Sequence, residues 1–356
     1  MTDARSKIIH SFIIMFTSSS VRAMMRRVSS SSSSSSSRRR TARDYGTTTR
    51  CRSGSPASAS AVASETTGSS SSASSSLSVV SWNVNGVRAL MKKDPLVLDT
   101  LASRTRADVL ALQETKLGAD GERALGDADA FLADYGVRAF ATSAGRKGYS
   151  GVALFIRNDC ASTIKRIERV ELGIEEFDVE GRALVAELDS CYVVNAYVPN
   201  SGADLKRLDA RVDAWERAMR AYINNLQSGG SGENHPAGKP VVYCGDLNVA
   251  HEDVDLWGRH AENAKSAGFT PRERAAMSTL LTECDMIDTY RTLHGPNAQA
   301  FTYWSYRGGA RAKNRGWRLD YVLASASLRR RVEDAYALPD VLGSDHCPVG
   351  VVFRDM

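Results

Sequence analysis

Acidic, amide and imidazole side chains stand at the ends of several apolar segments in this 356-residue sequence. Asn83, Glu114 and Asp246 each follow a run of large apolar residues. Comparable positions, or the turns beside them, are taken by Tyr197, Asn200, Asn248, Asp320, Asp345 and His346. Hydrolysis of a phosphodiester needs a cation on the phosphate, an oriented water and donors for the charge that develops. Side chains of these types could supply all three.

Each of these residues also has an ordinary explanation by itself. Glu114 could be a solvated acid, Asp246 could form a turn, and the pair Asp345-His346 could cap a loop. Their joint placement after apolar segments favours the chemical interpretation. Nucleotide cofactors lack support, because the sequence contains neither a P-loop nor the glycine pattern of dinucleotide-binding folds.

The apolar segments that would position these side chains are typical of β-strands. We predict strands at residues 77–82, 109–112, 152–157, 183–188, 191–197, 241–244, 319–323 and 349–353. Two of them are followed by a similar pattern, Asn83 with Asn85 and Asp246 with Asn248, which is a weak indication of two related halves.

Helical patterns are fewer than strand patterns. Apolar residues at steps of three and four predict an amphipathic helix over residues 204–226, followed by a loop over residues 228–238. Thr270, with a proline and a glutamate after it, predicts a capped helix start, and a further helix is expected near Asp94. Because strands outnumber helices, two packed sheets flanked by helices are favoured over a doubly wound parallel sheet.

Residues 1–76 differ in composition from the rest of the chain. They are rich in Ser and Arg, and they contain eleven of the 46 basic residues but only three of the 41 acidic ones. Large apolar residues are too few to offset chain entropy, so we expect disorder. The composition resembles a transit peptide for a chloroplast or a mitochondrion; a plain disordered tail and a nuclear location remain alternatives. The apolar patch at residues 8–16 is too short and interrupted to span a membrane.

Residues 77–356 are expected to form one domain of two packed layers and flanking helices. They hold 35 basic and 38 acidic residues, so the formal charge of +5 for the whole chain is no evidence of DNA binding by this part. If this part binds a polyanion, a local basic surface and a metal ion would have to supply the positive charge. The six cysteines are scattered without a CxxC pair, which indicates a reduced compartment and argues against structural zinc.

Nine motifs in order identify a resemblance that covers nearly all of residues 77–353. They are Ser81-Trp-Asn-Val-Asn-Gly-Val-Arg88, Leu112-Gln-Glu-Thr-Lys116, Gly148-Tyr-Ser-Gly-Val152, Glu180-Gly-Arg182, Asn195-Ala-Tyr-Val-Pro-Asn200, Cys244-Gly-Asp-Leu-Asn-Val-Ala-His251, Ala267-Gly-Phe-Thr-Pro271, Gly316-Trp-Arg-Leu-Asp-Tyr321 and Gly343-Ser-Asp-His-Cys-Pro348. Together they resemble the exonuclease III type of apurinic/apyrimidinic (AP) endonuclease. The resemblance implies an α+β fold, a four-layer α/β/β/α sandwich of two mostly antiparallel sheets flanked by helices.

The resemblance also implies a role for each matched residue. Glu114 would be the main ligand of Mg²⁺, or of Mn²⁺ in its place, with Asn83 and Asp345 nearby. Asp246 would orient or deprotonate the attacking water, with help from Asn248. His346, held by Asp320, would donate to the phosphate oxygen, which Tyr197 and Asn200 would also contact. Asp246, Asn248 and His346 are further candidate metal ligands, and the number of ions stays open.

The implied substrate is double-stranded DNA that contains an abasic site, cut 5′ to the site to leave a 3′-hydroxyl. Some 3′-phosphodiesterase or 3′-5′ exonuclease activity would accompany this cut. A pocket matched here by Tyr303, Trp317 and Leu319 would take the flipped sugar, although these residues could instead be ordinary core. The candidates for holding DNA are Arg88, Lys116, Lys147, Tyr149, Asn200 and Asn263. We expect a monomer that acts away from membranes.

Four positions depart from patterns in parts of the family. Asn85 is neutral where some members carry an acid, which argues against a strong second metal site. Ala203 replaces an Arg that enters the duplex in some animal members, and Arg307 and Gly308 replace wedge residues. Two rival functions also remain: a related phosphodiesterase that acts on RNA or a lipid headgroup, and a non-catalytic nucleic-acid-binding module.

Overall fold

The structure, a computed structural model, describes residues 76–126, 131–229, 238–258 and 260–356. The predicted tail lies outside the described residues except for Ser76, as does most of the predicted loop at residues 228–238. Among the described residues, no helix has the length and apolar character needed to cross a membrane.

Two six-stranded sheets form the centre of the described domain. The first sheet has the order β11-β12-β1-β2-β4-β3, and the second has the order β5-β6-β7-β8-β10-β9. The first contains β1 (Leu77–Asn83), β2 (Val109–Gln113), β3 (Val137–Ala141), β4 (Val152–Ile156), β11 (Val332–Ala337) and β12 (Val349–Phe353). The second contains β5 (Ile164–Arg169), β6 (Ala183–Leu188), β7 (Tyr192–Tyr197), β8 (Val241–Asp246), β9 (Met286–Asp288) and β10 (Asp320–Ser325).

Both sheets pair their strands in the same way. The central pairs, β1 with β2 and β7 with β8, are parallel, and every other neighbouring pair is antiparallel. In parallel neighbours the carboxyl ends meet at one edge, so the polar residues that follow these strands are brought to the same side. The predicted two-sheet, mostly antiparallel fold is confirmed.

Three buried apolar clusters separate the layers. One fills the space between the two sheets, where Val79 of β1 and Val193 of β7 both belong. The next residue of β1, Val80, belongs to a second cluster beneath helices, because successive side chains of a strand point to opposite faces. The third lies between the second sheet and the helices that contain Met219 and Met277. Strands buried on both faces explain the continuous apolar runs of the sequence.

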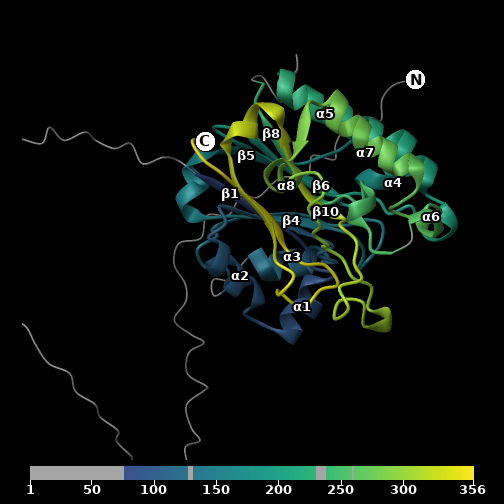
Figure 1. Ribbon diagram of the computed structural model, residues 1–356. Helices are drawn as coiled ribbons and strands as arrows, with labels where there is room; N and C mark the ends of the chain where they lie inside the picture. Colours follow the sequence, from purple (N-terminus) through teal and green to yellow (C-terminus); the bar gives the residue numbers. More distant parts are fainter. Residues whose placement is uncertain (1–75, 127–130, 230–237, 259) are drawn as a thin grey trace, which may run out of the picture. The chain divides into compact units, whose positions relative to one another are not determined.

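Helices cover the outer face of each sheet (Figure 1). The α-helices are α1 (Val87–Lys93), α2 (Val97–Thr105), α3 (Ala119–Gly126), α4 (Glu175–Asp178), α5 (Arg217–Ser228), α6 (His260–Asn263), α7 (Pro271–Glu283) and α8 (Thr289–His294). Short helical turns are η1 (Asn158–Thr163), η2 (Ala203–Leu205), η4 (Asp253–Asp255), η5 (Arg307–Gly309) and η6 (Ala326–Arg331), while η3 (Ala210–Glu216) is a π-helix. In Figure 1, α1, α2 and α3 lie on one side of the sheets, and α5 and α7 lie on the other. The four-layer prediction is therefore confirmed.

The predicted helices are present, but some of them begin at other residues than predicted. The α7 start has the predicted reciprocal cap between Thr270 and Glu273. The helix predicted from residue 204 is wrong at its start, since Asp204 has a left-handed φ of 55° and the Arg207 N–H donates to the Ser201 carbonyl. Apolar spacing reports burial, but it does not fix the φ of a residue. The helix predicted near Asp94 begins at Val97, because Asp94 caps the end of α1, which the sequence analysis missed.

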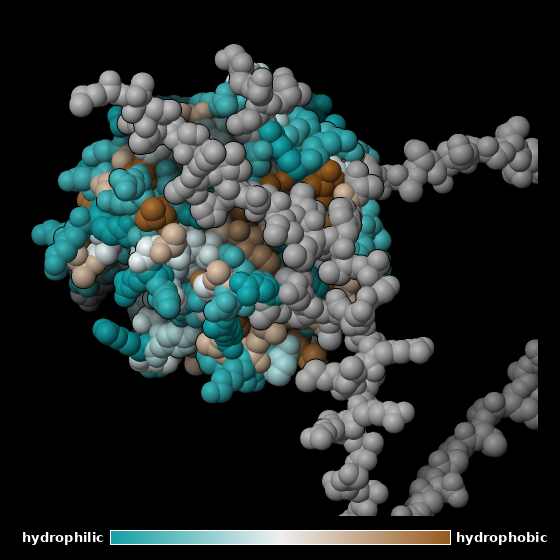
Figure 2. All heavy atoms as spheres, turned by 180° about the vertical axis from the view of Figure 1, so that it is seen from behind, coloured by the Kyte–Doolittle hydropathy of each residue, from teal (hydrophilic) through white to brown (hydrophobic). Residues whose placement is uncertain are grey.

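The surface is mainly hydrophilic on the face seen in Figure 2, where hydrophobic residues show in several separate places. The large exposed apolar side chains of the described residues are Leu96, Val179, Trp257, Leu293, Tyr306 and Leu342. Five cysteines are described and unpaired, and four of these are buried. A cavity of about 460 Å³ beside α2 is lined by none of the predicted site residues, so this cavity is not the candidate active site.

Candidate active site

Two turns with the same geometry deliver polar side chains from neighbouring sheets. After β1, the Asn85 N–H donates to Asn83 Oδ1 at 3.0 Å, and after β8, the Asn248 N–H donates to Asp246 Oδ1 at 2.9 Å. Asn85 and Asn248 both have a left-handed φ, 47° and 49°, a conformation that asparagine tolerates better than most residues. The repeated sequence pattern therefore reflects a repeated turn. It does not mark equivalent strands, because β8 occupies the place in its sheet that β2 occupies in the other.

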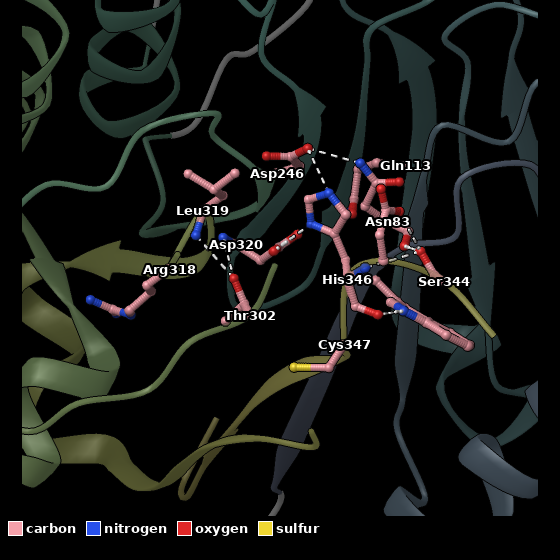
Figure 3. A network of polar contacts seen from close by, with 12 residues as sticks. Asn83, Gln113, Asp246, Thr302, Arg318, Leu319, Asp320, Ser344, His346 and Cys347 are labelled. Atoms are coloured by element: carbon pink, nitrogen blue, oxygen red, sulfur yellow. Dashed lines mark hydrogen bonds and ion pairs between the residues drawn. The ribbon is translucent and has the colours of Figure 1, made fainter. Parts of the chain in front are cut away.

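Asp246, His346 and Asp320 form a buried triad (Figure 3). His346 Nδ1 lies 2.8 Å from Asp320 Oδ2, and His346 Nε2 lies 3.8 Å from Asp246 Oδ2. Asp246 ends β8 and Asp320 begins β10, and these residues are register partners in the antiparallel pair. Possible ligand atoms of the three residues lie within 4.8 Å of one another. Because Asp320 holds one nitrogen of the imidazole, the triad is arranged for moving a proton as well as for ligating an ion.

Burial and mutual charge shift the titration of the triad. Burial raises the pKa of Asp246 to about 7, and the nearby Asp320 carboxylate acts in the same direction. Burial acts to lower the pKa of His346, but the charges of Asp320 and Asp246 outweigh it and raise the pKa to about 10. His346 is therefore a cation at neutral pH, while Asp246 is able to take up a proton.

Asn83 connects this triad to Glu114. Its Nδ2 donates to Asp246 Oδ2 at 2.8 Å and to Glu114 Oε1 at 3.0 Å. Asn83 is fully buried at the end of β1, and Glu114 follows β2 with a left-handed φ of 49°. Through this amide, carboxylates that are far apart in the sequence lie next to each other.

A second group of polar residues, which we call the outer cluster, consists of Glu114, Lys116, Asn85 and Asp345. Lys116 Nζ lies 2.9 Å from Glu114 Oε2 and also donates to Asn85 Oδ1. Asn85 Nδ2 donates to Asp345 Oδ1 at 2.9 Å. Burial would raise the pKa of Glu114, but the hydrogen bond from Asn83 and the charge of Lys116 hold it below its usual value. The cluster thus presents a charged carboxylate and amide oxygens around a point where a cation, the Lys116 ammonium, already lies.

This donor set fits a hard divalent ion. Oxygen ligands of mixed carboxylate and amide type, in part accessible to water, suit Mg²⁺. Glu114, Asn83 and Asp345 would hold the ion. The neutral side chain of Asn85 reduces the negative charge available to a second one.

Tyr197 and Asn200 lie near the triad, and their contacts to a phosphate stay predictions. Asn200 Nδ2 donates to Asn248 Oδ1 at 2.8 Å, and Asn248 Nδ2 donates to the Val198 carbonyl at 2.9 Å. Burial raises the pKa of Tyr197 well above its usual value, and the charges of Glu114 and Asp246 add to the effect. The Tyr197 hydroxyl therefore stays protonated and can donate to an anion.

The three residues predicted to line a pocket belong to one cluster, which we call the aromatic cluster. Buried Leu319 and the partly buried Tyr303 and Trp317 pack together, and the further members are Ala250, Leu256 and Phe269. The ring of Tyr303 lies 4.9 Å from the ring of His346. The aromatic cluster therefore adjoins the triad.

The remaining predicted residues are spread around this centre. Lys116 belongs to the outer cluster, and Tyr149 lies near Tyr197 through Arg182, whose guanidinium stacks on both rings. Arg88 is exposed on α1. Asn263 ends α6, a helix whose His260 ring lies 5.9 Å from that of Phe269 in the aromatic cluster. The structure brings neither Arg88 nor Asn263 into the triad, and their DNA contacts stay predictions.

Several supporting residues were given no role by the sequence analysis. Gln113 Nε2 donates to Asn195 Oδ1 at 2.8 Å, which joins β2 to β7 across the two sheets directly below the site. Thr302 Oγ1 accepts from the backbone N–H groups of Leu319 and Asp320. The available signal was a polar residue inside or beside an apolar strand, because such a side chain needs a partner when it is buried.

A buried ion pair supports the turns of the site from behind. Arg211, fully buried in the π-helix η3, lies 2.8 Å from Glu273 Oε1 and donates to the Leu247 carbonyl at 2.7 Å. Glu273 in turn accepts from the Ser201 hydroxyl at 2.5 Å and from the Gly268 N–H at 2.8 Å. These contacts tie the turns after β7 and β8 to the start of α7.

Comparison with known proteins decides the family. Residues 80–346 match the model of the "Endonuclease/Exonuclease/phosphatase family". The chain belongs to this family. It is 40% identical over 280 residues to an exodeoxyribonuclease of Bacillus subtilis, a match that covers 78% of the chain and 100% of the relative. It is 36% identical over 280 residues to the DNA-(apurinic or apyrimidinic site) endonuclease of Dictyostelium discoideum, covering 78% and 70%.

A solved structure is similar over the same region. The AP endonuclease of Leishmania major superposes with a TM-score of 0.71 at 32% identity, covering 78% of this chain and 88% of that one. The suspected relationship to AP endonucleases is therefore confirmed at the level of family and fold. The roles of individual residues still rest on the geometry described above.

Proposed function

We propose that the protein is a Mg²⁺-dependent AP endonuclease of base excision repair, with Mn²⁺ as a substitute ion. It hydrolyses the phosphodiester 5′ to an abasic site and leaves a 3′-hydroxyl, with accompanying 3′-phosphodiesterase or 3′-5′ exonuclease activity. Relatives that carry endonuclease and exodeoxyribonuclease names support this assignment. The observation that carries it is the 4.9 Å distance between the rings of Tyr303 and His346, which places the aromatic cluster directly beside the triad.

The triad supplies the proton chemistry. Asp246, whose pKa burial raises to about 7, orients the attacking water and takes its proton. His346, a cation at neutral pH, donates to the phosphate oxygen, where negative charge increases in the transition state. Asp320 fixes the imidazole through the 2.8 Å contact to Nδ1.

Amide and phenol groups hold the phosphate in place. Tyr197 donates from a hydroxyl whose pKa is raised, and Asn200 and Asn248 are locked to each other at 2.8 Å. A metal ion held by Glu114, Asn83 and Asp345 would neutralise phosphate charge and act as a Lewis acid. Hydrogen-bond donors that are already fixed in place stabilise the transition state, because they do not have to reorient during the reaction.

The aromatic cluster gives the preference for abasic DNA. Tyr303, Trp317 and Leu319 offer an apolar surface for a deoxyribose that has left the helix. Moving an abasic sugar out of the helix costs less free energy than flipping an intact nucleotide, because no base has to be unstacked and unpaired. Selection therefore rests on both the fit of the sugar and the low cost of flipping it.

Cleavage of defined substrates tests the proposal. A duplex with one abasic analogue is compared with intact duplex, RNA and sphingomyelin, with EDTA and then with Mg²⁺ added back. We expect the abasic duplex to be cut best, on its 5′ side, and only when a divalent ion is present. Equal or faster turnover of another substrate would assign the chain to a different phosphodiesterase activity, and binding without any turnover would indicate a non-catalytic module.

We further propose that residues 1–76 direct the enzyme to a chloroplast or mitochondrion, and that it acts as a monomer. The composition of this segment, rich in Ser and Arg and poor in acids, supports the first point. A fluorescent protein fused behind residues 1–76 should enter an organelle, and the same fusion without them should not. Sedimentation of the full chain tests the second point.

A further inference from the structure

The hydroxyl of Tyr149 is held by two arginines. It accepts from Arg182 Nη2 at 3.0 Å and from Arg207 Nη1 at 3.0 Å. A phenol oxygen has two acceptor positions and one proton. Both acceptor positions are filled, and among the described residues no hydrogen bond engages the proton. Since Tyr149 is only half-buried, this proton is available to an acceptor outside the protein.

Glu180 holds the two arginines together. Its carboxylate pairs with Arg182 Nε and lies 3.2 Å from Arg207 Nη2. We call these three residues the Arg–Glu–Arg cluster. The Arg207 guanidinium also lies 5.0 Å from the centre of the Phe177 ring, so the long side chain is packed rather than free in solvent.

The same cluster reaches the centre of the active site. Arg182 is nearly fully buried, donates to the Tyr197 carbonyl at 2.9 Å and stacks 4.8 Å above the Tyr197 ring. Tyr197 ends β7 beside Glu114 and Asp246. Tyr149 is therefore positioned relative to the catalytic centre by one buried guanidinium, whereas Arg207 is its more exposed support.

We propose that Arg207 is a positioning residue that, with Arg182 and Glu180, holds the Tyr149 hydroxyl so that its proton is donated to a backbone phosphate of bound DNA. The proposal rests on the proposed function and extends it to the grip on the DNA strand. A donor backed by two cations strengthens a hydrogen bond to an anionic oxygen more than one to a neutral base edge. Such a contact sets the position of the duplex without reading its sequence.

A double-mutant cycle tests the coupling between Arg207 and Tyr149. Dissociation constants are measured in EDTA for an abasic-analogue duplex and for an intact duplex of the same length. The variants are Tyr149→Phe, Arg207→Met and the two combined. We expect each single change to weaken binding about 5-fold, the size of one lost hydrogen bond. The combined variant should bind no worse than Tyr149→Phe alone, because Arg207 acts through the hydroxyl.

Two further variants separate positioning from other effects. Arg272→Met removes a surface charge that pairs with Asp209 and Asp213 and does not touch Tyr149, so its effect should be the same with and without Tyr149→Phe. Arg207→Gln keeps a neutral donor and should restore part of the lost affinity, which also serves if Arg207→Met does not fold. Independent losses for Tyr149→Phe and Arg207→Met, or no loss in either, would refute the positioning role.

The duplex pair distinguishes this proposal from the proposed function. A phosphate contact is present in both duplexes, so the coupling should appear with intact DNA as well. If the parent protein does not prefer the abasic duplex but the coupling persists, the substrate assignment fails and the Arg207 proposal stands. If the parent protein prefers the abasic duplex but the losses of Tyr149→Phe and Arg207→Met are additive, the Arg207 proposal fails and the substrate assignment stands.

Discussion

The active site contains two polar groups that differ in burial. The side chains of the triad of Asp246, His346 and Asp320 are at most 6% exposed, whereas those of Glu114 and Lys116 in the outer cluster are 18% and 31% exposed. Burial raises the pKa of Asp246, while Glu114 keeps a pKa below its usual value. The site therefore contains one carboxylate that can exchange a proton near neutral pH and another that stays charged and open to ions.

This contrast has a physical reason in the partners of each carboxylate. Asp246 faces a second carboxylate, Asp320, in a place from which water is excluded, so its charged form is disfavoured. Glu114 faces an ammonium and an amide donor, which favour its charged form although it is also largely shielded. For Asp246, burial outweighs the attraction of the nearby His346 cation and the pKa rises, whereas for Glu114 the amide and ammonium partners outweigh burial and the pKa falls.

The largest expected effect comes from removing the proton chemistry. Asp246→Asn and His346→Asn should each lower kcat at least about 10³-fold, because general acid–base groups contribute on this scale. Binding of the abasic duplex should survive in both variants, since the phosphate and sugar contacts remain. Single-turnover cleavage and duplex binding in EDTA measure the two quantities. Wild-type rates in both variants would exclude the triad from the reaction.

The next effect separates the outer cluster from the triad. Glu114→Gln should weaken Mn²⁺ binding at least about 10-fold, a loss that calorimetry or Mn²⁺ resonance measures directly. High Mg²⁺ should restore part of its activity, but it should not restore the activity of Asp246→Asn. Unchanged ion affinity in Glu114→Gln would place the metal elsewhere.

The pH dependence tests the charges inside the triad. Activity should rise with pH as Asp246 loses its proton, with a pKa of about 7, and fall as His346 loses its proton, with a pKa of about 10. Asp320→Asn removes a carboxylate that raises the pKa of His346, so the falling limb should move to lower pH. The profile of kcat/KM shows this shift. A falling limb that stays in place would mean that another group is the acid.

The smallest effect concerns the neutral member of the outer cluster. Asn85→Asp adds a charge next to Glu114 and Asp345, and about 2- to 5-fold tighter Mn²⁺ binding is expected from one further charge in a solvated site. The gain is limited because Lys116 would pair with the new carboxylate. Asn85→Ser, which adds no charge, is the control and should bind the ion no better than the parent chain.

Much of the fold could be predicted because its signals are local. The apolar runs of β1, β2 and β8 predicted strands that begin at the correct residues, although each observed strand extends one or two residues further. The capped start of α7 lies where Thr270 and Glu273 indicate. Helix α1 was missed, and the helix predicted from residue 204 was wrong at its start. In these places the backbone follows hydrogen bonds and left-handed residues that apolar spacing does not report.

The sequence by itself determined which side chains are present at the strand ends, and hence that phosphodiester chemistry was available. Only the tertiary structure decided which of them meet: Asn83 and Asp246 are 163 positions apart, yet the amide and the carboxylate are 2.8 Å apart. Tertiary structure also brought the Arg207 guanidinium to the Tyr149 hydroxyl, although these residues are 58 positions apart. The reason is that strand pairing and sheet packing set distances between remote residues, and charge and burial act through those distances.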